Sequence, residues 1–246
     1  MKIIDSHVYL GQGSHLQMSL DQLLTGMDEA GIAISIVCFP DHYLAVHNTE
    51  GNNLLISAVR AHPRRLVGMA AVNPWYGESA VAELRRALGE GLTGLFLHSV
   101  YQGFILSDPV VNPLIQVAED FHVPVYIHTG TAGLAEPFHA VELARRFPKV
   151  NFIMGHAGSS DFGEDAVRSL DFAQNLWLET SRNGPANFCL FAARKCFSRV
   201  VFGSSAPEYI PSVELENLYD VITDPHDREA VLFRNIQAVY RGKLNP

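Results

Sequence analysis

Short apolar runs alternate with longer amphipathic segments along the whole chain. The runs are five to seven residues long and rich in β-branched and aromatic residues, a pattern that favours buried strands. It predicts strands at residues 2–8, 34–39, 66–72, 93–98, 123–128, 150–156, 176–180 and 199–203.

Between the runs, apolar residues recur with the period of a helix. Capping residues mark several ends: Ser19 precedes the first such segment, Gly31 closes it, and Asp224 followed by Pro225 begins the last. The pattern predicts helices at residues 19–31, 52–63, 79–91, 110–121, 137–148, 164–172, 185–197 and 224–241.

Repeated strand–helix units favour a parallel sheet with helices outside it. Eight such units in 246 residues match the size of a (β/α)8 TIM barrel, so we predict one α/β domain over residues 1–246. A doubly wound open sheet is the alternative, but no Gly-x-Gly-x-x-Gly motif follows the first strand.

Composition and charge argue against nucleic-acid-binding and membrane-spanning proteins. The formal net charge is −8 and the basic residues form no stripe, which argues against nucleic acid as a partner. No apolar stretch reaches the roughly 18–20 residues of a membrane span, and no signal peptide is evident. Three cysteines without a Cys-x-x-Cys pair suit a reducing compartment, so we expect a cytoplasmic protein.

Four histidines lie at or next to the ends of predicted strands: His7, His98, His128 and His156. The active site of a TIM barrel lies at the carboxyl ends of its strands. Imidazole fills a core poorly, whereas it is a frequent zinc ligand and a natural acid or base near neutral pH. The four positions therefore predict a metal or proton-transfer site.

Several segments, taken in order, resemble motifs of the amidohydrolase superfamily, and of its amidohydrolase-related branch of metal-dependent hydrolases and decarboxylases. The first strand "IDSHVYL" is similar to Asp-x-His-x-His, and "VPVYIHTG" and "NFIMGHAG" resemble the histidine motifs of the fifth and sixth strands. "VVFGSSAP" resembles Phe-Gly-Ser-Asp-x-Pro. The likeness covers essentially the whole chain.

The resemblance implies roles for individual residues. His7 and His128 would be metal ligands, and His156 would lie beside the metal as a ligand or proton-transfer group. Two positions depart from the family pattern, because Tyr9 replaces the second histidine of the first motif and Ser205 replaces the aspartate of the last. Phenol and serine hydroxyls are weak ligands at neutral pH.

Glu179 ends the seventh predicted strand and is an alternative base or ligand. We therefore expect His156 and Glu179 to be catalytic, and His7 and His128 to hold a divalent metal, with zinc preferred. His98, Tyr9, Arg182 and Ser205 are expected to bind substrate, and an arginine at the mouth suits a carboxylate.

Three interpretations remain open: a reduced metal site, a metal-free site that uses His156 and His128 as acid and base, and a decayed site that only binds a ligand or partner. The leading expectation is hydrolysis of a small ester, amide or lactone, with non-oxidative decarboxylation as an alternative. The partner would be a small molecule, and relatives of this fold are often dimers, so a homodimer is also expected.

Overall fold

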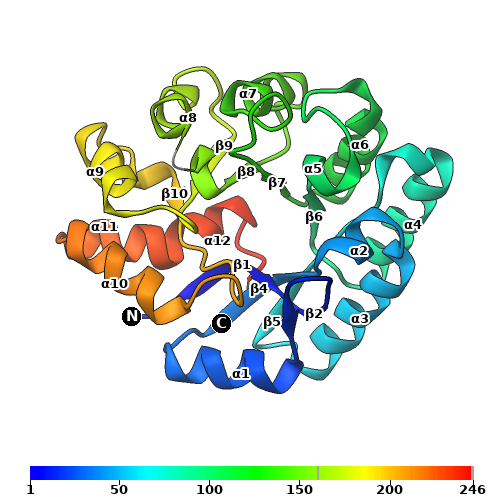
Figure 1. Cartoon of the computed structure of the whole chain (residues 1–246), viewed down its shortest axis with the longest axis horizontal. Helices are drawn as coiled ribbons and strands as arrows, with labels where there is room; N and C mark the ends of the chain where they lie inside the picture. The colour runs from blue at the N-terminus through cyan, green and yellow to red at the C-terminus, as the bar shows by residue number, and fades with distance from the viewer. Residues whose placement is uncertain (160, 245–246) are drawn as a thin grey trace.

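The computed structural model describes residues 1–159 and 161–244, and shows a ring of strands surrounded by helices (Figure 1). Within these described residues the main sheet has eight strands, each parallel to its neighbours, in the order β1-β4-β5-β6-β7-β8-β9-β10. The strands are β1 (Ile4–Tyr9), β4 (Ile34–Cys38), β5 (Leu66–Ala70), β6 (Gly94–Leu97), β7 (Val125–His128), β8 (Phe152–Gly155), β9 (Leu176–Glu179) and β10 (Val200–Val201). A separate hairpin is formed by β2 (Gly11–Gln12) and β3 (Gln17–Met18).

Hydrogen bonds join the last strand region to the first and complete the barrel. The Ser6 N–H donates to the Phe202 carbonyl at 2.9 Å, and the Ser205 N–H donates to the His7 carbonyl at 2.9 Å. The predicted TIM barrel is thus confirmed. Because β10 continues into this closure, residues 203–205 lie directly beside the first strand.

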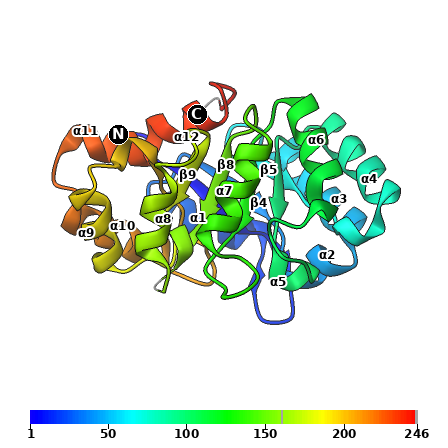
Figure 2. The ribbon, with the colours of Figure 1, turned by 90° about the horizontal axis from the view of Figure 1, so that it is seen from above.

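Helices cover the outside of the ring, and both termini lie on the side opposite the β2–β3 hairpin (Figures 1 and 2). The helices are α1 (Leu20–Glu29), α2 (Asp41–Ala45), α3 (Asn48–Ala61), α4 (Glu78–Gly89), α5 (Ser99–Gln102), α6 (Asn112–Phe121), α7 (Pro137–Arg146), α8 (Gly163–Ser169), α9 (Pro185–Ala193), α10 (Pro211–Val221), α11 (Pro225–Glu229) and α12 (Asn235–Val239). A π-helical turn, Ala230–Arg234, joins the last two.

The region after the last strand differs from the prediction. We expected β10 to be followed directly by a helix at residues 224–241, but α10 comes first. Its sequence mixes buried Leu215 and Leu218 with a buried acid, Glu214, which weakens the apolar periodicity. The helix is held by packing against α9, a contact between segments distant in sequence.

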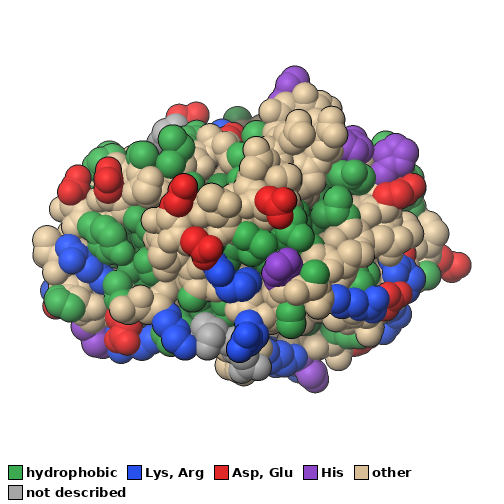
Figure 3. All heavy atoms as spheres, turned by 90° about the horizontal axis from the view of Figure 1, so that it is seen from below, with side chains coloured by type: hydrophobic (Ala, Val, Ile, Leu, Met, Phe, Trp, Pro, Cys, Tyr) green, Lys and Arg blue, Asp and Glu red, His purple; other side chains and the backbone are tan. Residues whose placement is uncertain are grey.

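Charged side chains of both signs are interspersed on the face shown in Figure 3. Among the described residues, no helix combines the length and apolar character needed to cross a membrane.

The first strand does not alternate regularly. Regular alternation along β1 would place Asp5, His7 and Tyr9 on one face, but the pairing with β4 shifts between Asp5 and Val8. Asp5 pairs with Ser35 and Val8 with Val37, so one extra residue is inserted and Asp5 and Val8 share the face toward α1. His7 and Tyr9 lie on the other face. The bulge therefore removes Asp5 from the lumen.

Candidate active site at the carboxyl ends of the strands

The predicted site residues gather at one end of the barrel. His7 and Tyr9 come from β1, His128 ends β7, and Glu179 ends β9. The remaining members follow strands directly: His98 after β6, His156 after β8, Arg182 after β9 and Ser205 after β10. The barrel thus brings residues from β1, β6, β7, β8, β9 and β10 to a shared opening.

His7 is enclosed by aromatic rings. Its imidazole stacks on Tyr126 with 4.5 Å between ring centroids, and Phe96 lies on it at 5.6 Å. Tyr9 and His156 meet its edges at 4.8 and 5.5 Å. Neither ring nitrogen of His7 has a hydrogen-bond partner among the residues that the structure describes, although both are buried. An unpaired buried imidazole is costly, which makes His7 a candidate to bind a group that the protein itself does not supply.

Glu179 is fully buried and accepts a dense set of hydrogen bonds. Its Oε2 accepts from the Tyr126 hydroxyl at 2.8 Å, the His156 N–H at 2.9 Å and the Ser181 Oγ at 2.8 Å. Its Oε1 accepts from the Ser181 N–H. A Cβ atom at Gly203 would overlap this carboxyl group, so glycine is required there. Burial raises the pKa of Glu179, and these hydrogen bonds oppose that shift.

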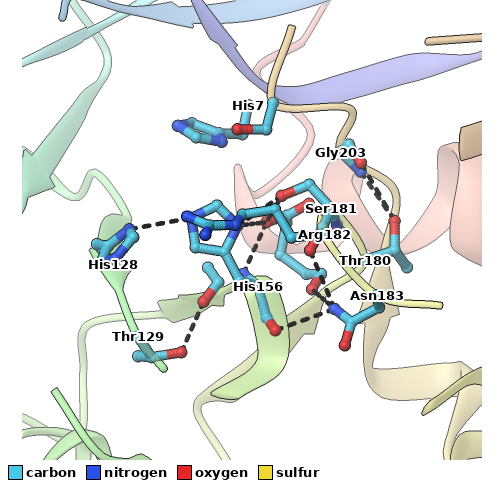
Figure 4. Close-up of polar contacts among 12 residues, drawn as sticks. His7, His128, Thr129, His156, Thr180, Ser181, Arg182, Asn183 and Gly203 are labelled. Carbon is cyan, nitrogen blue, oxygen red and sulfur yellow. Dashed lines mark hydrogen bonds and ion pairs between the residues drawn. The ribbon is translucent and has the colours of Figure 1, made fainter. Parts of the chain in front are cut away.

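A chain of side chains runs from Glu179 to the mouth, and Figure 4 shows its members Ser181, His156 and His128. Ser181 Oγ lies 2.8 Å from His156 Nδ1, and His156 Nε2 lies 3.0 Å from His128 Nδ1. The ring of His128 stacks on His98 with 3.8 Å between centroids. His98 in turn accepts a hydrogen bond from the Tyr101 N–H at its own Nδ1.

The four histidines are held neutral. Burial lowers the pKa of His7 and of His128 to about 3, and the nearby Arg182 charge acts in the same direction. Burial also places the pKa values of His98 and His156 well below the usual histidine value. Neutral imidazoles offer one lone pair and one N–H each, the form needed for ligation or proton transfer.

Arg182 is the cation of this site. It adopts a left-handed backbone conformation with φ of 61°, which is uncommon for a residue with a side chain and is often found at functional sites. Its charge lowers the pKa of all four histidines of the site. Its Nη1 atom is 3.6 Å from Glu208 Oε1.

Ser205 and Tyr9 occupy the two positions that depart from the family motifs. The Ser205 hydroxyl donates to Glu208 Oε2 at 3.2 Å, and its own φ is also left-handed, at 58°. Tyr9 is buried next to His7, and burial raises the pKa of its phenol well above the ordinary value. Both side chains are therefore neutral at physiological pH.

Three side chains of the site have the ligand atoms that a divalent metal ion requires. Potential ligand atoms of His7, His156 and Glu179 lie within 4.8 Å of one another. Two imidazoles and a carboxylate suit zinc or manganese, and the unpaired nitrogens of His7 support the fit. His128, expected from the sequence as a ligand, lies outside this cluster and is hydrogen-bonded to His156.

Three residues of the site were not predicted. Tyr126 alternates with His128 along β7, and Ser181 follows Glu179 by two residues, so period-two spacing could have indicated both. Glu208 is reached only through the turn after Ser205, and no sequence pattern marks it.

The barrel and its histidine-lined mouth define a TIM-barrel protein whose candidate active site lies at the carboxyl ends of the strands. The family model described as "Amidohydrolase" matches residues 26–242. The chain belongs to this amidohydrolase family, as expected from its motifs.

Solved structures share the fold. A 2,6-dihydroxybenzoate decarboxylase from Rhizobium superposes with a TM-score of 0.79 at 16% identity, covering 98% of each chain. A 5-carboxyvanillate decarboxylase from Novosphingobium aromaticivorans, complexed with manganese and a nitrobenzoic acid, gives 0.78 at 15% identity, covering 98% of this chain and 96% of that one.

One curated relative also matches. The 2-amino-3-carboxymuconate-6-semialdehyde decarboxylase of Dictyostelium discoideum is 32% identical over 78 residues, which is 31% of this chain. The match spans 22% of the length of that relative.

Proposed function

We propose that this protein catalyses non-oxidative decarboxylation of a small carboxylate-bearing substrate at the barrel mouth. The relatives reported above are named as decarboxylases, which favours this reaction over the hydrolysis expected from the sequence. The observation that carries the proposal is the cluster of four buried imidazoles in mutual contact at the mouth, close enough to Arg182 for its charge to lower their pKa values.

Arg182 would bind an anionic oxygen group of the substrate. An ion pair with the carboxylate that departs would stabilise the ground state against loss of CO2. We therefore place a second anionic oxygen group of the substrate at Arg182, and the carboxylate that reacts at the imidazoles. Phe96 and Tyr126, both buried, form an apolar floor that excludes water from the reacting carbon.

Loss of CO2 leaves the electron pair of the broken C–C bond on the substrate carbon, which must then take a proton. Of the four histidines, His128 has the highest exposed fraction, 7%, and in the described part of the chain no hydrogen bond engages its Nε2. This nitrogen delivers the proton to that carbon in our proposal, and water at the mouth returns a proton to His128, so the net change is carboxylate plus one proton to CO2 and the protonated product. His156 Nε2, which lies 3.0 Å from His128 Nδ1, orients the ring.

A divalent ion, with zinc or manganese as the candidates, would be held by His7, His156 and Glu179. Both ring nitrogens of His156 are hydrogen-bonded to other side chains, so ligation by His156 would replace its bond to Ser181 or to His128. When bound, it would polarise a substrate oxygen. Tyr9 and Ser205 add neutral hydrogen-bonding groups near that position, and His98 supports the His128 ring by stacking.

The test measures CO2 release from a panel of small aromatic and unsaturated carboxylic acids, alongside esters and lactones. We expect CO2 release by the wild type and a loss of about 100-fold or more in kcat for His128→Gln. His226→Gln, an exposed histidine on α11, is the matched control and should keep full activity. CO2 release that is unchanged in His128→Gln would contradict the proposed proton donor. Turnover of esters alone would restore the hydrolase interpretation.

The expected homodimer stays a prediction. Light scattering of the purified protein at micromolar concentration measures its mass directly.

A further inference from the structure

Glu208 lies at the carboxyl-terminal side of the barrel, in the loop that joins β10 to α10. Its Oε2 accepts the hydrogen bond of the Ser205 hydroxyl, and its backbone N–H donates to the Ser205 carbonyl at 2.9 Å. These two bonds direct the carboxylate toward Arg182. The side chains of Glu208 and Arg182 are 30% and 33% exposed, so both are reachable from solvent.

The guanidinium of Arg182 has an N–H group without a hydrogen-bond partner among the described residues. The distance of 3.6 Å to Glu208 is an ion pair but too long for a hydrogen bond. The Arg182 Nε is buried, and within residues 1–159 and 161–244 it has no hydrogen-bond partner. A guanidinium presents a planar fork of donors that a carboxylate can occupy with two parallel hydrogen bonds. Arg182 therefore has unfilled donor capacity, next to a carboxylate that only partly neutralises it.

We propose that Glu208 is a specificity-determining residue that acts as a displaceable counter-ion of Arg182. In the free protein it partly neutralises the guanidinium, and an incoming carboxylate must displace it to form the bidentate pair. This inference rests on the proposed function only in that both place an anionic group of the substrate at Arg182.

The charges around the mouth give the reason for such a counter-ion. Arg182 and Glu208 are both about one-third exposed and lie 3.6 Å apart, so an anion that approaches the guanidinium also meets the carboxylate. The Glu208 carboxylate repels any anion that approaches Arg182. A ligand that makes two hydrogen bonds to the guanidinium offsets the free energy of this repulsion. A weakly anionic or misplaced ligand does not offset it.

The test measures binding of benzoate and of its uncharged analogue benzamide by titration calorimetry at low ionic strength. The Glu208→Gln variant keeps the shape and removes the charge, so we expect benzoate to bind about threefold to tenfold more tightly than to the wild type. Benzamide affinity should stay the same. The matched control is Asp120→Asn, which removes the acid of an exposed ion pair with Arg85 on the outside of the barrel, and it should change neither affinity.

A second variant shows whether Glu208 acts through Arg182. In the Arg182→Gln background we expect benzoate binding to be weakened at least tenfold, and Glu208→Gln to add no further gain. Circular dichroism and thermal unfolding of each variant establish that it is folded.

Equal or weaker benzoate binding by Glu208→Gln would overturn the inference, as would a gain that persists without Arg182. A benzamide gain equal to that for benzoate would also overturn it, because the effect would then be steric. Binding is measured without turnover, so a protein that binds benzoate as expected but releases no CO2 from any acid would refute the proposed reaction and leave the counter-ion in place.

Discussion

The neutral state of His128 makes a prediction that can be worked out from the structure. In the unfolded chain its pKa is near the ordinary value of 6.5, whereas burial lowers its pKa in the folded protein to about 3. Between these two pKa values the imidazole is protonated in the unfolded state and neutral in the folded state. The stability associated with this residue is complete above pH 6.5 and is lost as pH falls from there toward 3.

The magnitude follows from these pKa values. At pH 5.5 the unfolded imidazole is protonated about ten to one, which stabilises the unfolded state by about 1.4 kcal/mol. At pH 8 the same contribution is close to zero. The result does not depend on the exact pKa in the folded protein, provided that this value stays below about 4.5, because the folded residue is then unprotonated at both pH values.

The assay is urea denaturation of wild type and His128→Gln at pH 8 and pH 5.5. We expect the wild type to lose about 1.4 kcal/mol more than the variant between the two pH values. Asp5 has the opposite pH dependence, because burial raises its pKa to about 7, but it is present in both proteins and cancels. Comparison of the two proteins is therefore required, and the slope of the wild type alone is uninformative.

His226→Gln serves as the control, since this side chain is exposed. If wild type and His128→Gln lose the same free energy to within about 0.5 kcal/mol, His128 is not buried in the neutral form and the charge balance of the site described above is wrong.

Further predictions concern the groups around Glu179. Gly203→Ala places a methyl group against the Glu179 carboxylate, and urea denaturation should show a free energy of unfolding lower by about 2–4 kcal/mol. The control is Gly89→Ala on α4, where a methyl group meets open space. It should raise the free energy of unfolding by about 0.5–1 kcal/mol. Ser181→Ala removes the contacts to Glu179 Oε2 and His156 Nδ1; we expect a loss of about 1–3 kcal/mol and a lower kcat at unchanged KM. Calorimetric titration of metal-free protein with Mn²⁺ or Zn²⁺ should show about one site per chain, and His7→Ala should abolish it; unchanged binding would remove His7 from the ligand set.

Much of the fold could be predicted from the sequence because its signals are local. Each strand is an apolar run, and each helix has its own period and caps, so neither needs distant contacts to be recognised. The histidines are local signals as well, since each lies at or next to the end of an apolar run. The parallel barrel then implies that such ends meet at one opening.

The details of the site were not accessible in this way. The extra residue in β1 turns Asp5 away from the lumen, and it arises from the register with β4. The bond between His156 and His128, and the convergence of His7 with Glu179, depend on side-chain directions at the ends of separate strands.

The sequence by itself determined that eight strand–helix units close into a barrel and that imidazoles lie at its mouth, because these follow from patterns over a few neighbouring residues. Only the tertiary structure decided which of those imidazoles touch, that Glu179 is a buried hydrogen-bond acceptor, and that Glu208 faces Arg182. The physical reason is that burial, pKa and ion pairing are set by neighbours that lie far apart in the chain, and no local pattern records them.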